Sequence, residues 1–176
     1  MKILKSILLL VFVFTLSCSE SENSEEEQQQ TQGSISIAFT NGDGFVMENI
    51  VATLTNYYET DQTLNINITA DAEGPSGGKL TLTIVDNDDS FQALVNGSQF
   101  PIGDNTKSFY ATLRYVDNTS TFTGATGSLD IRSFQANLNG NSNKALLSAV
   151  FSSSDGTVIM NSTISDLILN CIECAG

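Results

Sequence analysis

The chain contains no histidine and no tryptophan among its 176 residues. Histidine is the commonest general base and the commonest metal ligand in proteins, so its absence excludes every histidine-dependent catalytic triad. Paired carboxylates, as in glycosidases, are the main catalytic groups that remain. A domain without these side chains is expected to be non-enzymatic, with carboxylate-dependent hydrolysis as the alternative.

Basic residues are also scarce, because seven Lys and Arg stand against 20 Asp and Glu, for a net charge of −13. Such a surface repels nucleic acid, and the sequence has no basic stretch with interleaved aromatic residues. The charge suits a soluble exterior that does not adhere to other surfaces.

No apolar run is long enough to span a membrane as a helix. The run at residues 7–16 has about ten residues, against the roughly 18 that a spanning helix requires. Lys2 and Lys5 precede it and small or polar residues follow, which is the layout of a signal peptide over residues 1–17. Its removal leaves five basic residues (Lys79, Lys107, Arg114, Arg132 and Lys144) against 20 acidic ones, a net charge of 5 − 20 = −15.

Thr15-Leu16-Ser17-Cys18 resembles a bacterial lipobox, although Thr15 departs from the leucine that usually begins the motif. The resemblance implies a diacylglyceryl thioether on Cys18 and an acyl chain such as palmitate on its amine, hence a lipoprotein anchored in the outer membrane. Several acyl chains together hold a protein durably on a membrane. The alternative is ordinary cleavage that leaves Cys18 as an N-terminal thiol.

The segment behind this cysteine, residues 18–32, is expected to be a disordered acidic tether. No apolar residue follows Cys18 in it, and it contains five glutamates: Glu20, Glu22, Glu25, Glu26 and Glu27. Such a composition cannot bury enough surface to offset chain entropy. An acidic run in this place also resembles the export signal of Bacteroidota-type surface lipoproteins, with a plain spacer as the alternative.

From residue 33 on, apolar residues recur at every second position, as Ile35, Ile37 and Phe39 do, which is the period of half-buried strands. Turn sequences such as Asn41-Gly42-Asp43-Gly44 and Asp155-Gly156 separate the runs. The pattern predicts nine or ten strands, near residues 33–40, 45–57, 63–70, 79–86, 93–95, 107–116, 121–123, 127–134, 145–152 and 157–169. We expect one all-β domain over residues 33–170, an antiparallel β-sandwich, with a closed β-barrel as the alternative.

Three pieces of this domain are similar to those of a family of small, acidic Bacteroidota surface lipoproteins. They are an Asn/Thr-rich hairpin at residues 64–84, the strand from Gly127 to Phe134, and the closing pair at residues 149–164. Where the family tends to have Gly-Thr-Phe, this chain has Ser148-Ala149-Val150-Phe151. The resemblance implies an all-β domain behind a lipobox and attaches no activity to any residue.

The densest acidic cluster is Asp86-Asn87-Asp88-Asp89, at the end of a predicted strand. Oxygen-rich loops of this kind hold Ca²⁺, so Asp86, Asp88 and Asp89 are the candidate ligands. The spacing does not match an EF-hand, and a solvated turn is the favoured interpretation. No other cofactor is expected.

Cys171-Ile172-Glu173-Cys174 lies too close to residue 176 for a thioredoxin-type helix to follow, and it supplies only two of the four ligands that zinc requires. A local disulfide remains, and the exporting leader favours it. Three residues of extended chain span about 10 Å, beyond the roughly 7 Å limit for bridged Cα atoms, so the strand must turn before Cys174.

Tyr57-Tyr58 and the pair Tyr110 and Tyr115 are candidates for an aromatic platform that stacks on sugars, with ordinary sheet packing as the alternative. Asp130 and Arg132 are interpreted as a surface ion pair. The sequence thus predicts a non-enzymatic, lipid-anchored envelope or cell-surface module that binds a glycan, a Ca²⁺-bridged partner or another envelope protein. The alternative is a carboxylate-dependent hydrolase that acts on extracellular polymers.

Overall fold

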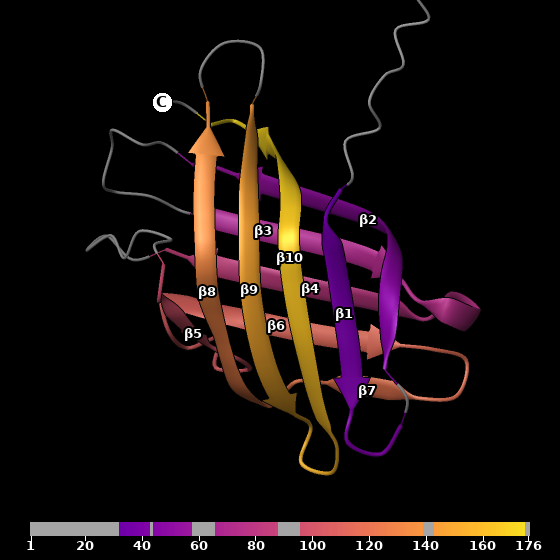
Figure 1. Ribbon diagram of the computed structural model, residues 1–176. Coiled ribbons are helices and arrows are strands. Elements are labelled where there is room, and N and C mark those ends of the chain that lie inside the picture. Colours follow the sequence, from indigo (N-terminus) through magenta and orange to yellow (C-terminus); the bar gives the residue numbers. More distant parts are fainter. Residues whose placement is uncertain (1–31, 43, 58–65, 88–95, 139–142, 175–176) are drawn as a thin grey trace, which may run out of the picture. The chain divides into compact units, whose positions relative to one another are not determined.

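Alternating apolar and polar residues produce ten β-strands and one 3₁₀ turn in the computed structural model, which describes residues 32–42, 44–57, 66–87, 96–138 and 143–174 (Figure 1). The elements are β1 (Ser34–Phe39), β2 (Phe45–Thr55), β3 (Ile66–Glu73), η1 (Pro75–Gly77), β4 (Lys79–Asp86), β5 (Gln99–Pro101), β6 (Phe109–Val116), β7 (Thr121–Thr123), β8 (Thr126–Asn137), β9 (Lys144–Ser154) and β10 (Ile159–Ile172).

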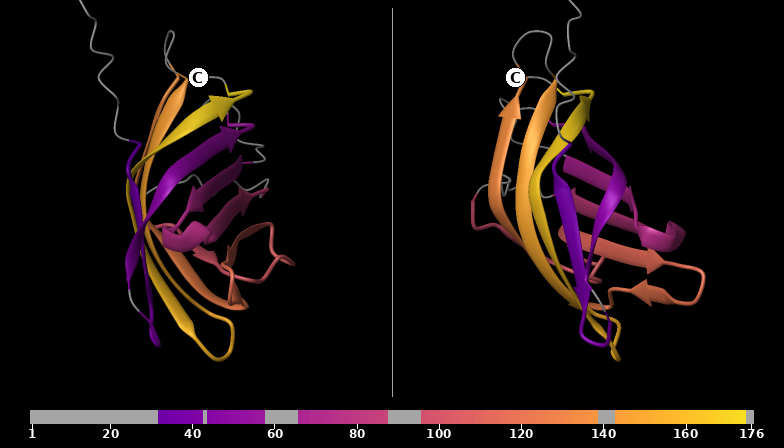
Figure 2. Two further views of the ribbon diagram at one scale, coloured as in Figure 1. Left: turned by 90° about the vertical axis from the view of Figure 1, so that its right-hand side faces the viewer. Right: turned by 45° about the vertical axis from the view of Figure 1, so that its right-hand side comes forward.

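The strands form one sheet in the order β5-β8-β9-β10-β1-β2-β3-β4-β6-β7. It is folded into two layers, in which the strands β8, β9, β10 and β1 cross those of β2, β3, β4 and β6 (Figures 1 and 2). The predicted all-β sandwich is therefore confirmed, and the alternative of a closed barrel is wrong. A single bridge between Ile102 and Ala111 brings the β5 end of the sheet beside β6 without forming a ladder.

Two β-bulges lie in the strands that join the layers. The register of β2 against β3 shifts between Glu48 and Val51, and that of β10 against β9 shifts between Ile164 and Leu167. Asn49 and Asp166, inside these bulges, each have φ of 49°, a left-handed conformation that short polar residues tolerate. Because bulges bend a strand, they allow residues 170–172 of β10 to pair in parallel with residues 53–55 of β2.

The core lies between the layers and is built from the inward residue of each alternating pair. Leu54, Leu82, Leu113 and Leu129 are each at most 2% exposed. Burial of a side chain of this size stabilises the fold by roughly 1.5–3 kcal/mol. The inward faces therefore supply most of the driving force for the two-layer arrangement.

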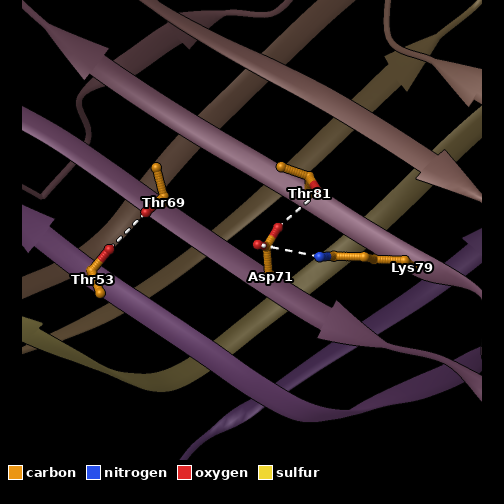
Figure 3. Close-up of polar contacts among 5 residues, drawn as sticks. All are labelled: Thr53, Thr69, Asp71, Lys79 and Thr81. Atoms are coloured by element: carbon orange, nitrogen blue, oxygen red, sulfur yellow. Dashed lines mark hydrogen bonds and ion pairs between the residues drawn. The ribbon is translucent and has the colours of Figure 1, made fainter.

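The outward face of β2, β3 and β4 is mostly polar, and short cross-strand contacts tie it together (Figure 3). The hydroxyls of Thr53 and Thr69 lie 2.7 Å apart, and the Thr81 hydroxyl donates to Asp71 Oδ1 at 2.7 Å. Lys79 Nζ lies 3.5 Å from Asp71 Oδ2. The Lys79 and Asp71 side chains are 57% and 46% exposed, so this face is solvated and such a pair contributes under about 1 kcal/mol.

Candidate functional site

Four aromatic side chains from four strands meet at one end of the domain, where the β1–β2, β6–β7 and β9–β10 turns lie (lower part of Figure 1). The ring centroid of Phe39 lies 5.5 Å from that of Tyr115 and 5.9 Å from that of Phe122. Phe45 lies 5.8 Å from Tyr115 and 6.3 Å from Phe39. All four rings are tilted or edge-on to one another, the arrangement that aromatic quadrupoles favour.

The local sequence explains how these rings come together. Phe39 ends β1 and Phe45 begins β2, so a short turn sets them at the same end of the hairpin. Tyr115 of β6 and Phe122 of β7 are direct antiparallel partners, and each is 4% exposed. Phe39 and Phe45 are only half-buried, so they present ring surface to solvent.

These rings border a pocket of about 590 Å³. Its other lining residues come mainly from the turns: Asn41, Gly42, Pro75, Asp117, Asn118, Thr119, Ser120, Thr121, Asp155 and Val158. The pocket thus combines an aromatic floor with a polar rim, and its size lies within the 300–1,000 Å³ typical of small-molecule sites.

The two acidic residues of the rim are held by their own turns. Asp117 Oδ1 accepts hydrogen bonds from the backbone N–H groups of Thr119 and Ser120, both at 2.7 Å. Asp155 Oδ1 accepts from the backbone N–H groups of Thr157 and Val158, both at 2.8 Å.

These bonds favour the ionised carboxyl groups. The pKa of Asp117 lies below 3.8, chiefly because the backbone N–H of Thr119 donates to it. The pKa of Asp155 also lies below 3.8, chiefly because the backbone N–H of Val158 donates to it. Burial, and next the charge of Asp117, raise the pKa of the Tyr115 phenol above 10. At neutral pH the rim therefore carries two negative charges beside a neutral phenol.

Of the predicted sugar-stacking tyrosines that the structure describes, one lies at this pocket. Tyr115 forms part of its floor, whereas Tyr57 follows the opposite end of β2 and packs on Phe134 with centroids 5.6 Å apart. Tyr110 is half-buried on β6, and Tyr58 lies outside the described residues. The three phenylalanines were not identified from the sequence as site residues. Phe39 and Phe45 flank a Gly-rich turn, and this is the signal that could have placed them side by side.

The predicted calcium ligands do not form a site in the described part of the chain. Asp88 and Asp89 lie outside the described residues, and Asp86 ends β4 with 2% exposure. Asp86 lies between Ile66 of β3 and Phe109 of β6, its partners in the sheet. The prediction that it belongs to a solvated turn is therefore wrong. Within the described residues, no group of three or more acidic or cysteine side chains could hold a metal ion.

The predicted ion pair of Asp130 and Arg132 is not formed among the described residues. The register of β8 against β9 shifts between Ile131 and Ser133, which interrupts the simple alternation that would place both side chains on one face. Asp130 instead borders a shallow hollow of about 390 Å³ over the outer face of β8, β9, β10 and β1.

Cys171 and Cys174 form a disulfide, with Cα atoms 5.9 Å apart. β10 ends at Ile172, and Glu173 has φ of 57°, which turns the chain between the cysteines. Cys174 Sγ lies 3.7 Å from the Leu54 carbonyl oxygen, so the bridge packs beside β2 at the end of the domain away from the aromatic pocket.

The predicted signal peptide, Cys18 and the acidic tether as far as residue 31 lie outside the described residues. None of the described segments forms a helix of the length and hydropathy that crossing a membrane requires.

Comparison with known proteins adds no relative from which a role could be transferred. No family model, no curated protein and no solved structure matches this chain. The function must therefore be argued from the aromatic pocket and the sequence.

Proposed function

We propose that this protein is a non-enzymatic, lipid-anchored envelope or cell-surface protein whose β domain is a binding module. The observation that carries the proposal is the pocket floored by Phe39, Phe45, Tyr115 and Phe122. Half-buried aromatic rings at a concave site are unfavourable to leave in water, and a ligand that covers them recovers that free energy. The ligand site is this pocket.

The anchoring part of the proposal rests on sequence. The lipobox-like segment before Cys18 and the acidic stretch behind it fit a domain that is held off a membrane by a flexible tether. A pocket at the turns of such a domain would be open to ligands outside the inner membrane.

Hydrolysis by paired carboxylates is the competing function, because Asp117 and Asp155 border the same pocket. A general acid needs a raised pKa in order to keep its proton at neutral pH. Both carboxyl groups have lowered pKa values instead. Neither is suited to donate a proton to a leaving group, so binding is favoured over catalysis.

Replacement of Cys18 tests the anchor. We expect Cys18→Ser to move the full chain from the membrane fraction to the soluble fraction after a carbonate wash, while the wild-type protein stays with the membrane. A variant that remains fully membrane-bound would contradict lipid anchoring at this residue.

A blocked pocket tests the binding function. Thr121 and Thr123 are both exposed on β7, but only Thr121 lines the pocket. In a thermal-shift screen of saccharides and organic amines, Thr121→Trp should abolish any stabilisation that the wild type shows, and Thr123→Trp should keep it. If no compound raises the melting temperature of the wild type, the binding role is wrong and a structural role replaces it.

A further inference from the structure

We propose that the aromatic pocket binds a small organic cation of the quaternary ammonium class. This inference rests on the proposed binding function and names the chemistry of the ligand. Three features of the pocket carry it: the sign of its charge, the aromatic floor, and the hydrogen bonds that its carboxylates already accept.

The charge of the pocket has one sign. Among the described residues that line it, Asp117 and Asp155 are the charged ones, and none is a lysine or arginine. The chain as a whole carries a net charge of −13. An anionic ligand would be repelled from this site, and a cation would be drawn toward it.

The floor offers the surface on which organic cations bind. A cation within about 6 Å of an aromatic ring is attracted by the negative face of the ring, and quaternary ammonium groups are recognised in this way. Phe39 and Phe45 are half-buried and border the pocket beside the more deeply buried Tyr115 and Phe122. The methyl groups of such a ligand would also cover apolar ring surface.

Each carboxylate is held in place by its own turn, mainly through one oxygen, and keeps its negative charge. Asp117 Oδ1 accepts from the backbone and hydroxyl groups of both Thr119 and Ser120, and its Oδ2 accepts from the Ser120 hydroxyl at 3.1 Å. Asp155 Oδ1 accepts three bonds from Thr157 and Val158. A quaternary ammonium has no N–H to donate, so it needs no free acceptor on these oxygens and responds to their charge.

Binding of choline tests the charge requirement, with 3,3-dimethyl-1-butanol as its uncharged isostere and maltose as the saccharide probe. The full-length lipoprotein is titrated calorimetrically in a polyoxyethylene detergent, whose headgroup is neither sugar nor ammonium. We expect choline to bind about tenfold more tightly than the isostere, and added salt to weaken it.

Two variants locate the site. Asp155→Asn keeps a turn acceptor but removes a charge, and it should weaken choline binding by about threefold or more. Asp104→Asn is the matched control, because Asp104 caps an equivalent turn with Thr106 but does not line the pocket. Phe39→Leu should likewise weaken choline binding, and Phe134→Leu, at the far end of the domain, should leave it unchanged.

The outcomes separate this inference from the function on which it rests. Equal affinity for choline and its isostere, or equal effects of the Asp155 and Asp104 variants, overturns the ammonium ligand. Binding of maltose that Thr121→Trp abolishes, without binding of choline, also overturns it while the binding function stands. Absence of binding by every probe here and by the wider screen overturns both.

Discussion

The hydroxyl of Tyr115 occupies the space that a side chain on Gly78 would need. A Cβ built on Gly78 would overlap that oxygen and lie 2.8 Å from the ring carbon that carries it. Gly78 has φ of −65° and ψ of 136°, a conformation open to any residue. The phenol, and not the backbone, therefore requires glycine here, and the β3–β4 connection is fitted to the floor of the aromatic pocket.

Replacement of this glycine should disturb both the fold and the pocket. Gly78→Ala forces the Tyr115 ring to move, and overpacking of this kind lowers the free energy of unfolding by about 1–3 kcal/mol. Urea denaturation measures the loss. Gly42→Ala is the control, because its Cβ would meet nothing closer than 4.0 Å, and we expect it to stay within about 0.5 kcal/mol of wild type. Equal losses in the two variants would contradict the steric account.

The turn carboxylates predict a loss of stability in acid. Asp104, Asp117 and Asp155 all have folded-state pKa values below the ordinary 3.8. Because the folded-state pKa is depressed, the contribution of each is present above the unfolded-state pKa and disappears as the pH falls through the folded-state pKa. The free energy of unfolding should therefore decline below about pH 4.

One variant isolates this effect. Asp117→Asn keeps an acceptor oxygen but cannot ionise, so it should be less stable than wild type at pH 7. The difference between the two proteins should shrink as the pH falls below 3.8. Urea titrations at pH 7 and pH 3 measure it, and a difference that is the same at both pH values would rule out the charge as its cause.

The centre of the core should be sensitive to truncation. Leu82 is 2% exposed and lies between Ala70 of β3 and Leu113 of β6. Leu82→Ala is expected to lower the free energy of unfolding by about 2–5 kcal/mol, because the removed atoms leave a cavity. Thr83→Ala, on the outward face of the same strand, should lower it by less than about 1 kcal/mol. Similar losses would place Leu82 outside the core.

The alternation of apolar residues predicted the strands well because each layer buries only one face. Residues 79–86 and 121–123 were predicted with the bounds that β4 and β7 have. β5 was missed, since three residues that include Pro101 show no period. The predicted strand at residues 93–95 lies outside the described residues.

The folding of one sheet into two layers could not be predicted from alternation. It depends on where the register of β2 against β3 and of β10 against β9 shifts, at the bulges that hold Asn49 and Asp166, and alternation does not give those positions. The site was foreseen only through Tyr115. Its pairing with Phe122 depends on the β6–β7 register, and its approach to Phe39 depends on the crossing of the layers.

The disulfide of Cys171 and Cys174 should act locally, at the junction of β10 with β2. The Asn56 N–H donates to the Ile172 carbonyl between the two cysteines at 3.3 Å. In the chain-entropy account, a loop this short stabilises by about 2 kcal/mol or less. The double variant Cys171→Ser and Cys174→Ser should therefore lose at most that amount. Hydrogen exchange should become faster at the Asn56 amide and stay unchanged at the Leu82 amide, which lies in the central strand β4. Equal acceleration at both amides would show that the bridge stabilises the whole domain. Two titratable thiols in the unreduced wild-type domain would show that the bridge does not form.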